Sequence, residues 1–424
     1  MTRVRFLTPA LSLLVALSIT YPNQITADFA YVADNSNAPG TVTVIDTSDN
    51  AIIATITVGT GPDFIAFTPD GSFAYVTNNS GSTVSVIDTT SRTVVATITV
   101  GASPAGIAIT PNGQFAYVAN GSPTTVSVID TSDNAVASAI TLSAPFAIAI
   151  TPNGQFAYVT DLGTTGLVSV INTSNNSVVA TITVGGFPNG ASITPNGAFA
   201  YVANTSASSD TISVIDTSNN TVITTIPVGQ NPYSTAITAN GQFGYVSNSG
   251  ENTLSVINTT THLVTATVRV GNAPSESAFT QDGTLLYVPN MADDTISVID
   301  TSNNSIIATI TLGAGGAIGP IAIAMQPTAT PPSPVAPAKN LIGGQETNDF
   351  GLEYEILNFL RWEAPETLPA GYFVYRNNVK IATLAPTTLK YEDHDRKKGD
   401  STLYSITAFD SSDQESDPIT IEIN

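Results

Sequence analysis

The 424-residue chain contains no cysteine, so it forms no disulfide and offers no thiolate to a metal or to a covalently attached heme. Histidine is nearly absent as well. The only two, His262 and His394, fall in different predicted domains, so neither domain has a histidine pair for zinc or heme. A glycine-rich phosphate loop of the dinucleotide type is also missing. We therefore expect no metal, no cofactor and no catalytic residue.

Positive charge is scarce over most of the chain. Between Asp28 and Pro327 there is no lysine, and Arg92 and Arg269 stand against 18 acidic residues, a net charge of −16. A body this acidic repels the phosphate backbone of nucleic acids and the anionic surface of membranes. We expect a monomer with no nucleic-acid partner and no membrane insertion.

Long apolar runs are missing too. The N-terminal run, residues 6–19, follows Arg3 and Arg5 and is too short to span a membrane comfortably. A basic start, a short apolar core and a small residue before the mature chain are typical of a secretory signal peptide. Residues 1–27 are therefore predicted to be a signal peptide that is cleaved after Ala27, which exports the protein to the periplasm, the cell surface or the medium. The alternative is that residues 17–20 form a first inner strand.

What the chain has in abundance is an internal repeat. A Tyr-Val pair recurs seven times at intervals of 41–44 residues, and a Val-Ile-Asp or Val-Ile-Asn triplet follows each pair. Each unit contains four short runs of β-branched and aromatic residues bounded by Gly, Pro, Asn and Asp, which predict strands. A period of about 40–45 residues with four strands is typical of a β-propeller. The seven tyrosines are Tyr31, Tyr75, Tyr117, Tyr158, Tyr201, Tyr245 and Tyr287.

Turn formation explains the regularly placed acidic residues of the repeat. The triplet ends in Asp in five units but in Asn172 and Asn258 in the other two. The position therefore needs an oxygen that accepts a hydrogen bond, not a negative charge. We interpret these residues as turn formers, and not as catalytic acids or calcium ligands.

The phase of the repeat predicts how the ring closes. After the predicted signal peptide the chain begins with the second strand of a unit, and one innermost strand, residues 319–324, remains after the seventh unit. The numbers of strands match only if this last strand completes the first sheet, which removes two open sheet edges. The predicted fold class is all-β, a seven-bladed β-propeller closed by a C-terminal inner strand, followed by a small β-sandwich.

The repeat resembles the YVTN family of β-propeller repeats, which occurs in bacterial and archaeal surface and periplasmic proteins. The resemblance rests on Tyr-Val-Thr-Asn at residues 75–78, on variants such as Tyr-Val-Ala-Asn at residues 117–120, and on the Thr-Ile-Thr-Val-Gly runs. It covers about residues 29–325, so residues 28–326 are predicted to form the propeller. It implies a fold and not a function, because propellers host binding, scaffolding and catalysis alike.

The C-terminal part of the chain has a different composition. Five prolines fall within residues 327–338, which predicts a stiff linker. Alternating apolar and polar runs follow. Trp362, the only tryptophan, and Tyr404 resemble the core tryptophan and late-strand tyrosine of a fibronectin type III sandwich. Residues 339–424 are predicted to form one such domain.

The repeats differ most in the loops on one face, whereas the turns on the other face are nearly identical. Aromatic, amide and acidic residues gather where the variable face meets the channel mouth, and such a mixture suits contact with a protein or a glycan. The alternative is that these rings plug the channel or pack between blades. The candidate ligand-binding residues are Asp63, Phe64, Phe146, Phe187, Asn189, Tyr233 and Glu276.

These observations favour an exported, non-enzymatic binding and scaffold protein whose propeller recognises a protein or glycan partner at the cell envelope. One alternative is a hydrolase or lyase that uses channel-mouth carboxylates such as Asp63 and Glu276. The two lie in different units and form no obvious close pair in the sequence. Carboxylates within reach of each other over an open pocket would favour this alternative. A second alternative, binding of single-stranded nucleic acid, is opposed by the charge of −16.

Overall fold

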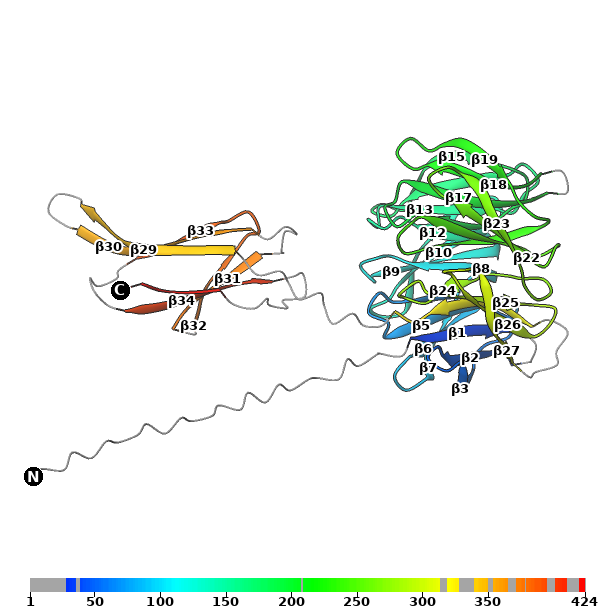
Figure 1. Cartoon of the computed structure of the whole chain (residues 1–424), viewed down its shortest axis with the longest axis horizontal. Coiled ribbons are helices and arrows are strands. Elements are labelled where there is room, and N and C mark those ends of the chain that lie inside the picture. Colours follow the sequence, from blue (N-terminus) through cyan, green and yellow to red (C-terminus); the bar gives the residue numbers. More distant parts are fainter. Residues whose placement is uncertain are drawn as a thin grey trace, which may run out of the picture. The chain divides into compact units, whose positions relative to one another are not determined.

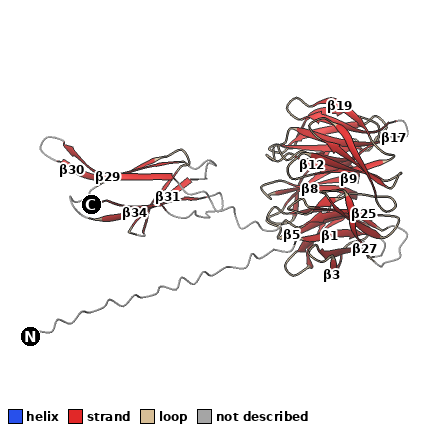
Figure 2. Cartoon of the chain, viewed as in Figure 1, coloured by secondary structure: helices blue, strands red, loops and turns tan. Residues whose placement is uncertain are grey.

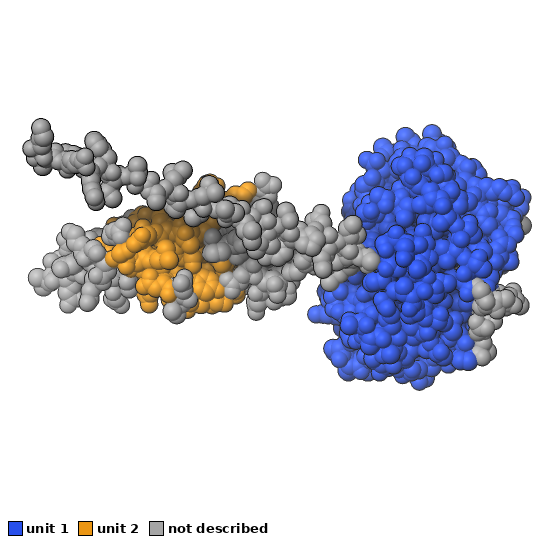
Figure 3. Space-filling model, turned by 60° about the horizontal axis from the view of Figure 1, so that its bottom comes forward, with its two compact units in different colours: residues 1–328 blue, residues 329–424 orange. Residues whose placement is uncertain are grey.

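The chain divides into two compact units, residues 1–328 and residues 329–424 (Figure 3), and each is described by itself. Every regular element among the described residues is a strand (Figure 2), and no helix there is long and apolar enough to cross a membrane. The predicted signal peptide and nearly all of the predicted linker lie outside the described residues. The computed structural model describes residues 28–35, 39–206, 209–312, 319–327, 339–349, 354–364, 371–377, 379–394, 401–409 and 419–423.

Burial explains which residues the strands contain. In β5 (Phe73–Asn78) and β6 (Thr83–Asp88) nearly every residue is buried, so the side chains on both faces are mostly apolar or small. β7 (Thr93–Thr99) instead alternates between exposed and partly buried residues, because it lies at the rim. The same patterns recur from sheet to sheet, so β-branched and small residues dominate the strands of this unit.

The first unit contains, within its described residues, seven four-stranded antiparallel sheets. Each sheet begins with an innermost strand, continues with the Tyr-Val strand and ends with a strand at the rim. In that order, the sheets are β28 (Pro320–Met325), β1 (Phe29–Asp34), β2 (Thr41–Asp46) and β3 (Ala51–Thr57); β4 (Pro62–Phe67), β5, β6 and β7; β8 (Ala102–Ile109), β9 (Phe115–Ser122), β10 (Thr124–Asp130) and β11 (Ala135–Thr141); β12 (Pro145–Ile150), β13 (Phe156–Asp161), β14 (Leu167–Asn172) and β15 (Ser177–Thr183); β16 (Pro188–Ile193), β17 (Phe199–Ser206), β18 (Ser209–Asp216) and β19 (Thr221–Pro227); β20 (Pro232–Ile237), β21 (Phe243–Asn248), β22 (Thr253–Asn258) and β23 (Leu263–Arg269); and β24 (Ala278–Phe279), β25 (Leu285–Asn290), β26 (Thr295–Asp300) and β27 (Ser305–Thr311).

The innermost strands follow one another around a central channel. β28 neighbours β4, and the succession continues through β8, β12, β16 and β20, while β24 returns to β28. Of these strands, β8, β12 and β24 are labelled in Figure 1. The sheets therefore form a closed β-propeller. β28 pairs with β1, with Ala324 opposite Tyr31 and Ile323 opposite Val32, so closure by the C-terminal inner strand is confirmed.

The apolar core lies between neighbouring sheets. In one cluster, Tyr117 and Val128 of one sheet pack with Val159 and Ile171 of the next. A fully buried side chain of this kind stabilises the fold by about 1.5–3 kcal/mol. The ring therefore depends on every sheet having a neighbour on both sides.

A hydrogen bond from the repeated tyrosine also joins neighbouring sheets, which the sequence analysis does not predict. Tyr117 Oη donates to Oδ1 of Asn176 at 2.6 Å, and Asn176 lies in the rim turn of the next sheet with a φ of 58°. Asn tolerates this left-handed conformation better than most residues. His262 takes the place of Asn in one turn, where its Nδ1 lies 3.0 Å from Tyr201 Oη. Four more pairs, each at 2.6 Å, are Tyr75–Asn134, Tyr158–Asn220, Tyr245–Asn304 and Tyr287–Asn50.

The rim turns confirm the interpretation of the repeated Asp residues as turn formers. Ser48 N donates to Asp46 Oδ1 at 2.9 Å, and Ser174 N donates to Asn172 Oδ1 at the same distance. Asp and Asn therefore do the same work at this position.

The second unit consists of two antiparallel sheets in its described residues. Trp362, Tyr372 and Tyr404 are buried in its core. Tyr404 Oη donates to Asp393, which also accepts a hydrogen bond from Arg376 at 3.0 Å. The three-stranded sheet is β29 (Lys339–Asp349), β30 (Tyr354–Glu363) and β33 (Lys390–Asp393), and the four-stranded sheet is β32 (Val379–Leu384), β31 (Gly371–Arg376), β34 (Thr402–Phe409) and β35 (Ile419–Ile423).

Candidate functional site

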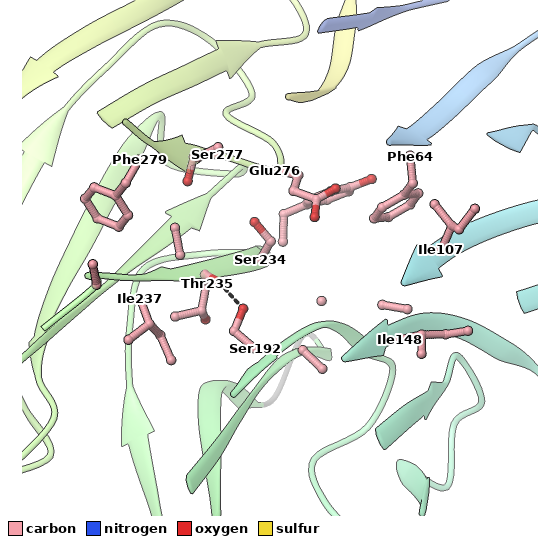
Figure 4. Close-up of a pocket in the computed structure, with 18 of the residues that line it drawn as sticks. Phe64, Ile107, Ile148, Ser192, Ser234, Thr235, Ile237, Glu276, Ser277 and Phe279 are labelled. Atoms are coloured by element: carbon pink, nitrogen blue, oxygen red, sulfur yellow. Dashed lines mark hydrogen bonds between the residues drawn. The ribbon is translucent and has the colours of Figure 1, made fainter. Parts of the chain in front are cut away.

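A cavity of about 410 Å³ lies in the channel of the first unit. Small-molecule sites usually occupy about 300–1,000 Å³. The innermost strands β4, β8, β12, β16 and β20 form its wall, together with the segment from Glu276 to Gln281 that contains β24 (Figure 4). At one end the lining reaches Ala239 and Gln281, which lie in or beside turns of the regular face.

The wall of the cavity has an apolar cluster on one side and, on the other, polar residues interspersed with Ile237 and Phe279. Phe64, Ile107 and Ile148 lie together on the right of Figure 4. Thr280 and Gln281, the latter with an amide side chain, follow β24 in the lining. The other polar residues come from β16, β20 and the approach to β24, and they carry hydroxyl or carboxyl oxygens. These residues are Ser192, Tyr233, Ser234, Thr235, Glu276 and Ser277.

Two carboxyl groups meet at the start of the innermost strands. Burial raises the pKa of Asp63 to about 7, although a hydrogen bond from Asn79 at 3.4 Å opposes the shift. Burial also raises the pKa of Glu276 to about 8, and the charge of Asp63 raises it further. The two groups belong to different sheets and are far apart in the sequence, yet they are near enough for the charge of one to act on the other. The sharp bend of the ring brings both strands to the same channel.

Tyr233 completes this group. Burial raises the pKa of its hydroxyl well above the ordinary range, and the charges of Asp63 and Glu276 raise it further. All three side chains therefore favour their neutral forms, because no positive charge offsets them. This part of the chain contains no lysine, so no ammonium group is available to stabilise the charged forms of these side chains.

Two buried hydroxyls in the lining have no hydrogen-bond partner. Thr235 is 4% exposed and Ser277 is 8% exposed, and neither side-chain oxygen is paired within the described part of the chain. Neither residue is among the site residues predicted from the sequence. A signal was present, because Thr235 holds the strand position that Ile107 and Ile148 hold in other sheets. A polar residue at an otherwise apolar core position is unusual.

Two glycines allow the innermost strands to approach each other. A Cβ on Gly106 would lie 2.5 Å from the carbonyl oxygen of Phe146. A Cβ on Gly190 would lie 2.8 Å from the carbonyl oxygen of Tyr233. Both positions are too close for a side chain, so part of the lining is bare backbone.

The structure brings five of the seven predicted site residues together at the channel. Phe64, Tyr233 and Glu276 line the cavity, and Asp63 interacts with the last two. Phe146 packs edge-on against Phe64, with ring centroids 5.9 Å apart, as the alternative of packing between blades requires.

The other two predicted residues are not in the lining. Phe187 is 40% exposed and has a φ of 49°, and Asn189 has a buried Oδ1 without a partner in the described part of the chain. Of the variable loops that suggested the ligand-binding face, the one before β24 contributes Glu276 and Ser277 to this cavity. The rest of its lining comes from the innermost strands and from turns of the opposite face.

Comparison with known proteins links the first unit to heme proteins. Residues 29–238, just under half of the chain, match the family model of the cytochrome D1 heme domain. No curated protein matches in sequence.

Three solved structures share the fold. Hydrazine synthase of Kuenenia stuttgartiensis is 23% identical with a TM-score of 0.59, over 62% of this chain and 90% of that one. A protein of unknown function from Desulfotomaculum acetoxidans is 22% identical with a TM-score of 0.63, over 70% and 99%. The dihydro-heme d1 dehydrogenase NirN, in complex with DHE, is 16% identical with a TM-score of 0.53, over 72% and 76%. At these identities the likeness establishes the fold alone.

The prediction of a non-enzymatic binding and scaffold protein is contradicted by these findings. The matching family model describes a heme domain, and one similar structure is a heme d1 dehydrogenase. Besides the export signal, the closed ring and the variable loops, the prediction rested on missing catalytic and metal-binding residues. Missing cysteine and histidine are informative only if the protein itself must supply the metal ligands. Over residues 29–238 the propeller is similar to the cytochrome D1 heme domain, and its function is to be sought in that context.

Proposed function

We propose that the propeller has a heme-related role and binds a tetrapyrrole macrocycle of the heme class in its channel cavity. The observation that carries the proposal is the match of residues 29–238 to the cytochrome D1 heme domain. That stretch includes β4, β8, β12, β16 and β20, which form most of the cavity wall. The part of the chain that matches is therefore the part that lines the site.

The cavity suits the organic part of such a ligand. Phe64, Ile107 and Ile148 offer an apolar surface, and the bare backbone at Gly106 and Gly190 permits close approach of a flat molecule. Because the described lining has no lysine or arginine to pair with the acidic side chains of a heme-type ring, that edge of the ligand belongs outside the cavity.

The same residues do not fit the iron. Heme iron is held by histidine, cysteine, methionine or tyrosine. No His, Cys or Met is among the described lining residues, and His262 lies in a rim turn against Tyr201. Tyr233 would have to ionise beside Asp63 and Glu276, whose charges oppose this. We therefore derive no step through the iron.

The cations that could pair with acidic side chains of the ring are also elsewhere. Arg92 lies 5.1 Å from the ring centroid of Phe29, and Arg269 ends β23, a strand at the rim. The described lining therefore suits the organic ring, but not its iron or its acidic side chains.

Titration of the purified full chain with hemin and with metal-free protoporphyrin tests the proposal. We expect saturable changes in the Soret absorbance with at least one of the two. Ala147, which is buried in the lining, provides the test variant: Ala147→Phe narrows the cavity and should weaken binding at least tenfold. Val95, 54% exposed on β7, provides the control, because Val95→Phe should bind as the parent does. No saturable binding of either ligand by the folded protein would overturn the proposal.

We also propose the finer architecture that the sequence suggests. The seven four-stranded sheets support a seven-bladed YVTN-type propeller, and the buried Trp362 and Tyr404 support a fibronectin type III-like second unit. The basic and apolar N-terminal segment supports export. Of the candidate ligand-contacting residues, we propose that Phe64, Tyr233 and Glu276 contact the macrocycle directly.

A further inference from the structure

The rim turns, which join the third and fourth strands of each sheet, use one position in two ways. Three of the seven turns carry Asn there, and each of these has Ser or Thr two residues later. Two turns carry Asp, and both have Ala two residues later. The turns with Asn are residues 175–177, 219–221 and 303–305, and those with Asp are residues 49–51 and 133–135. At this position a hydroxyl accompanies Asn in every case and Asp in none.

Formation of the turn does not require this hydroxyl. Asp49 Oδ1 accepts the backbone N–H of Ala51 at 2.9 Å, and Asn175 Oδ1 accepts that of Ser177 at 3.1 Å. Of these two acceptors, only Asn175 also receives a hydroxyl, that of Ser177 at 2.8 Å. Because the turn with Ala closes through the same backbone hydrogen bond, the hydroxyl beside Asn needs an explanation other than turn formation.

The first residue of the same turns provides an internal control. Ser48 donates its hydroxyl to Asp46 at 2.6 Å, and Ser174 donates its hydroxyl to Asn172 at 2.7 Å. Here the hydroxyl accompanies Asp and Asn alike, so it belongs to the turn. Burial excludes a different group from contact with other molecules: three Asn residues with Ser two residues later are fully buried, at positions 78, 120 and 204.

The side-chain amides of Asn175 and Asn219 are free to react. Both residues are exposed, and neither Nδ2 forms a hydrogen bond within the described part of the chain, whereas each Oδ1 makes contacts within its turn. Thr221 donates its hydroxyl to Asn219 Oδ1 at 2.7 Å. Asn303 differs, because its Nδ2 donates to Asp300 at 3.1 Å. Two of the three turns therefore offer an unengaged amide nitrogen beside a hydroxyl.

An exposed Asn followed two residues later by Ser or Thr is the acceptor for N-linked oligosaccharides in exported proteins, provided that the residue between them is not proline. The residues between are Asn176 and Asn220. We propose that Asn175 and Asn219 are N-glycosylated by transfer of an oligosaccharide from a lipid diphosphate carrier. Nδ2 forms a bond with the first carbon of the sugar, the bond from that carbon to the diphosphate breaks, and the amide loses one proton to a base of the transferase. The inference goes beyond the heme-related role and rests on the proposed export.

The rim beside these turns is a surface on which a bulky, solvated group has an effect. The fourth strands of the seven sheets have unpaired outer edges in the described structure, and Arg269 is the only charged residue in them. Val179 of β15 is 49% exposed, and Ile223 of β19 is 46% exposed. Open edges usually carry charges or other devices that prevent pairing with a second chain. An oligosaccharide on the turn before each of these two strands supplies such protection.

Intact mass measurement and peptide mapping of the full chain, purified from the cells and medium of its own host, test the inference. We expect oligosaccharide on Asn175 and Asn219. Asn172, whose hydroxyl belongs to the turn, and Asn303, whose amide is engaged, should carry little or none. Unmodified Asn175 and Asn219 in both fractions would overturn the inference.

Single-atom changes in the turns show whether the hydroxyl has the role that we infer. Ser177→Ala and Thr221→Ala recreate the Ala of the Asp turns, so both variants should fold, as circular dichroism melting checks, and each should lose the sugar on its own turn. Ser177→Thr should keep it. Thr93→Ala provides the control, because it removes a hydroxyl from a rim turn without Asn and should leave the attached mass unchanged. Sugar that survives both Ala variants would contradict the inference.

Hemin titration of the same variants separates this inference from the proposed function. Neither turn lines the cavity, so hemin should bind the unmodified variants as it binds the parent. Absence of tetrapyrrole binding in the parent would overturn the proposed function, while oligosaccharide on Asn175 and Asn219 would still support the modification.

Discussion

The Tyr-Val strands of the propeller hardly differ from sheet to sheet, whereas its innermost strands differ greatly. The seven tyrosines are all at most 2% exposed. The innermost strands, in contrast, carry Phe64, Gly106, Ala147, Gly190, Ser234 and Glu276 at one corresponding position. Each of the seven junctions between sheets requires a side chain of the same size and shape at this position, so the same residue recurs. The channel wall is shared by all sheets, so each position can differ.

This contrast separates the residues that build the ring from those that give the cavity its chemistry. A tyrosine that packs at every junction, and forms a hydrogen bond across most of them, serves stability. A glutamate in a place where most other sheets carry a glycine, alanine or serine does not, because burial opposes its charge. Predictions about stability can therefore test which class a residue belongs to.

The largest effect is expected from removing one innermost strand. Deleting residues 319–325 takes β28 away from β1 and removes the burial of Ala322 and Ile323. The inner edge of β1 is then left open, and the propeller should unfold, aggregate or exchange strands between molecules. Thermal melting followed by circular dichroism measures this.

The matched control for this deletion is truncation after Pro327, which keeps β28 and should melt as one cooperative unit. If both proteins melt at the same temperature, β28 does not stabilise the propeller, and the ring does not depend on closure by this strand.

A smaller effect is expected for the two carboxyls of the cavity. Their replacement should stabilise the protein at high pH, whereas deletion of β28 destabilises it. Folding raises the pKa of Asp63 from 3.8 to about 7 and that of Glu276 from 4.5 to about 8. The folded state then holds protons that the unfolded state has released, so the free energy of unfolding should fall as pH rises from about 4 to about 8. Each pKa unit is worth about 1.4 kcal/mol, so shifts of about three units in each of the two groups set an upper limit of roughly 9 kcal/mol.

Urea unfolding between pH 4 and pH 9 measures that slope. The double variant Asp63→Asn, Glu276→Gln should lose most of it and be more stable than the parent at pH 9. Asp300 provides the control, because hydrogen bonds from Ser302 lower the pKa of its carboxyl, and Asp300→Asn should leave the slope from pH 5 to pH 9 unchanged. An equal slope in the parent and the double variant would mean that the two carboxyls titrate normally.

The sequence predicts the residues that build the ring more completely than those that give the cavity its chemistry. The repeat identifies the strands, the turns and the closure by residues 319–324, because these depend on local pattern and on counting. It also singles out Phe64, Tyr233 and Glu276, because they depart from the pattern at the channel. It does not reveal that Asp63 and Glu276 interact, since that depends on how the ring curves. Thr235 and Ser277 escape for another reason: small hydroxyl residues are common in these strands and become significant only once they are seen to be buried and unpaired.

The smallest expected effect concerns the tyrosine hydroxyls, and it tests whether all seven junctions are equivalent. Tyr117→Phe removes the hydrogen bond to Asn176 and leaves the ring in place, so it should lower the free energy of unfolding by about 1 kcal/mol. Tyr31 differs, because Arg92 stands where the next sheet would carry Asn. The Tyr31 hydroxyl and Arg92 Nε lie buried at this junction without a well-formed hydrogen bond in the described structure.

Tyr31→Phe should therefore be neutral or slightly stabilising, since it removes a buried hydroxyl that has no partner to lose. The two variants delete the same atom from the same place in the repeat, so the difference between their free energies of unfolding isolates the hydrogen bond from the packing of the ring. Urea unfolding of both, beside the parent, gives that difference. Equal losses would show that Tyr31 is paired in solution, and the junction next to the closing strand would then be as strong as the others.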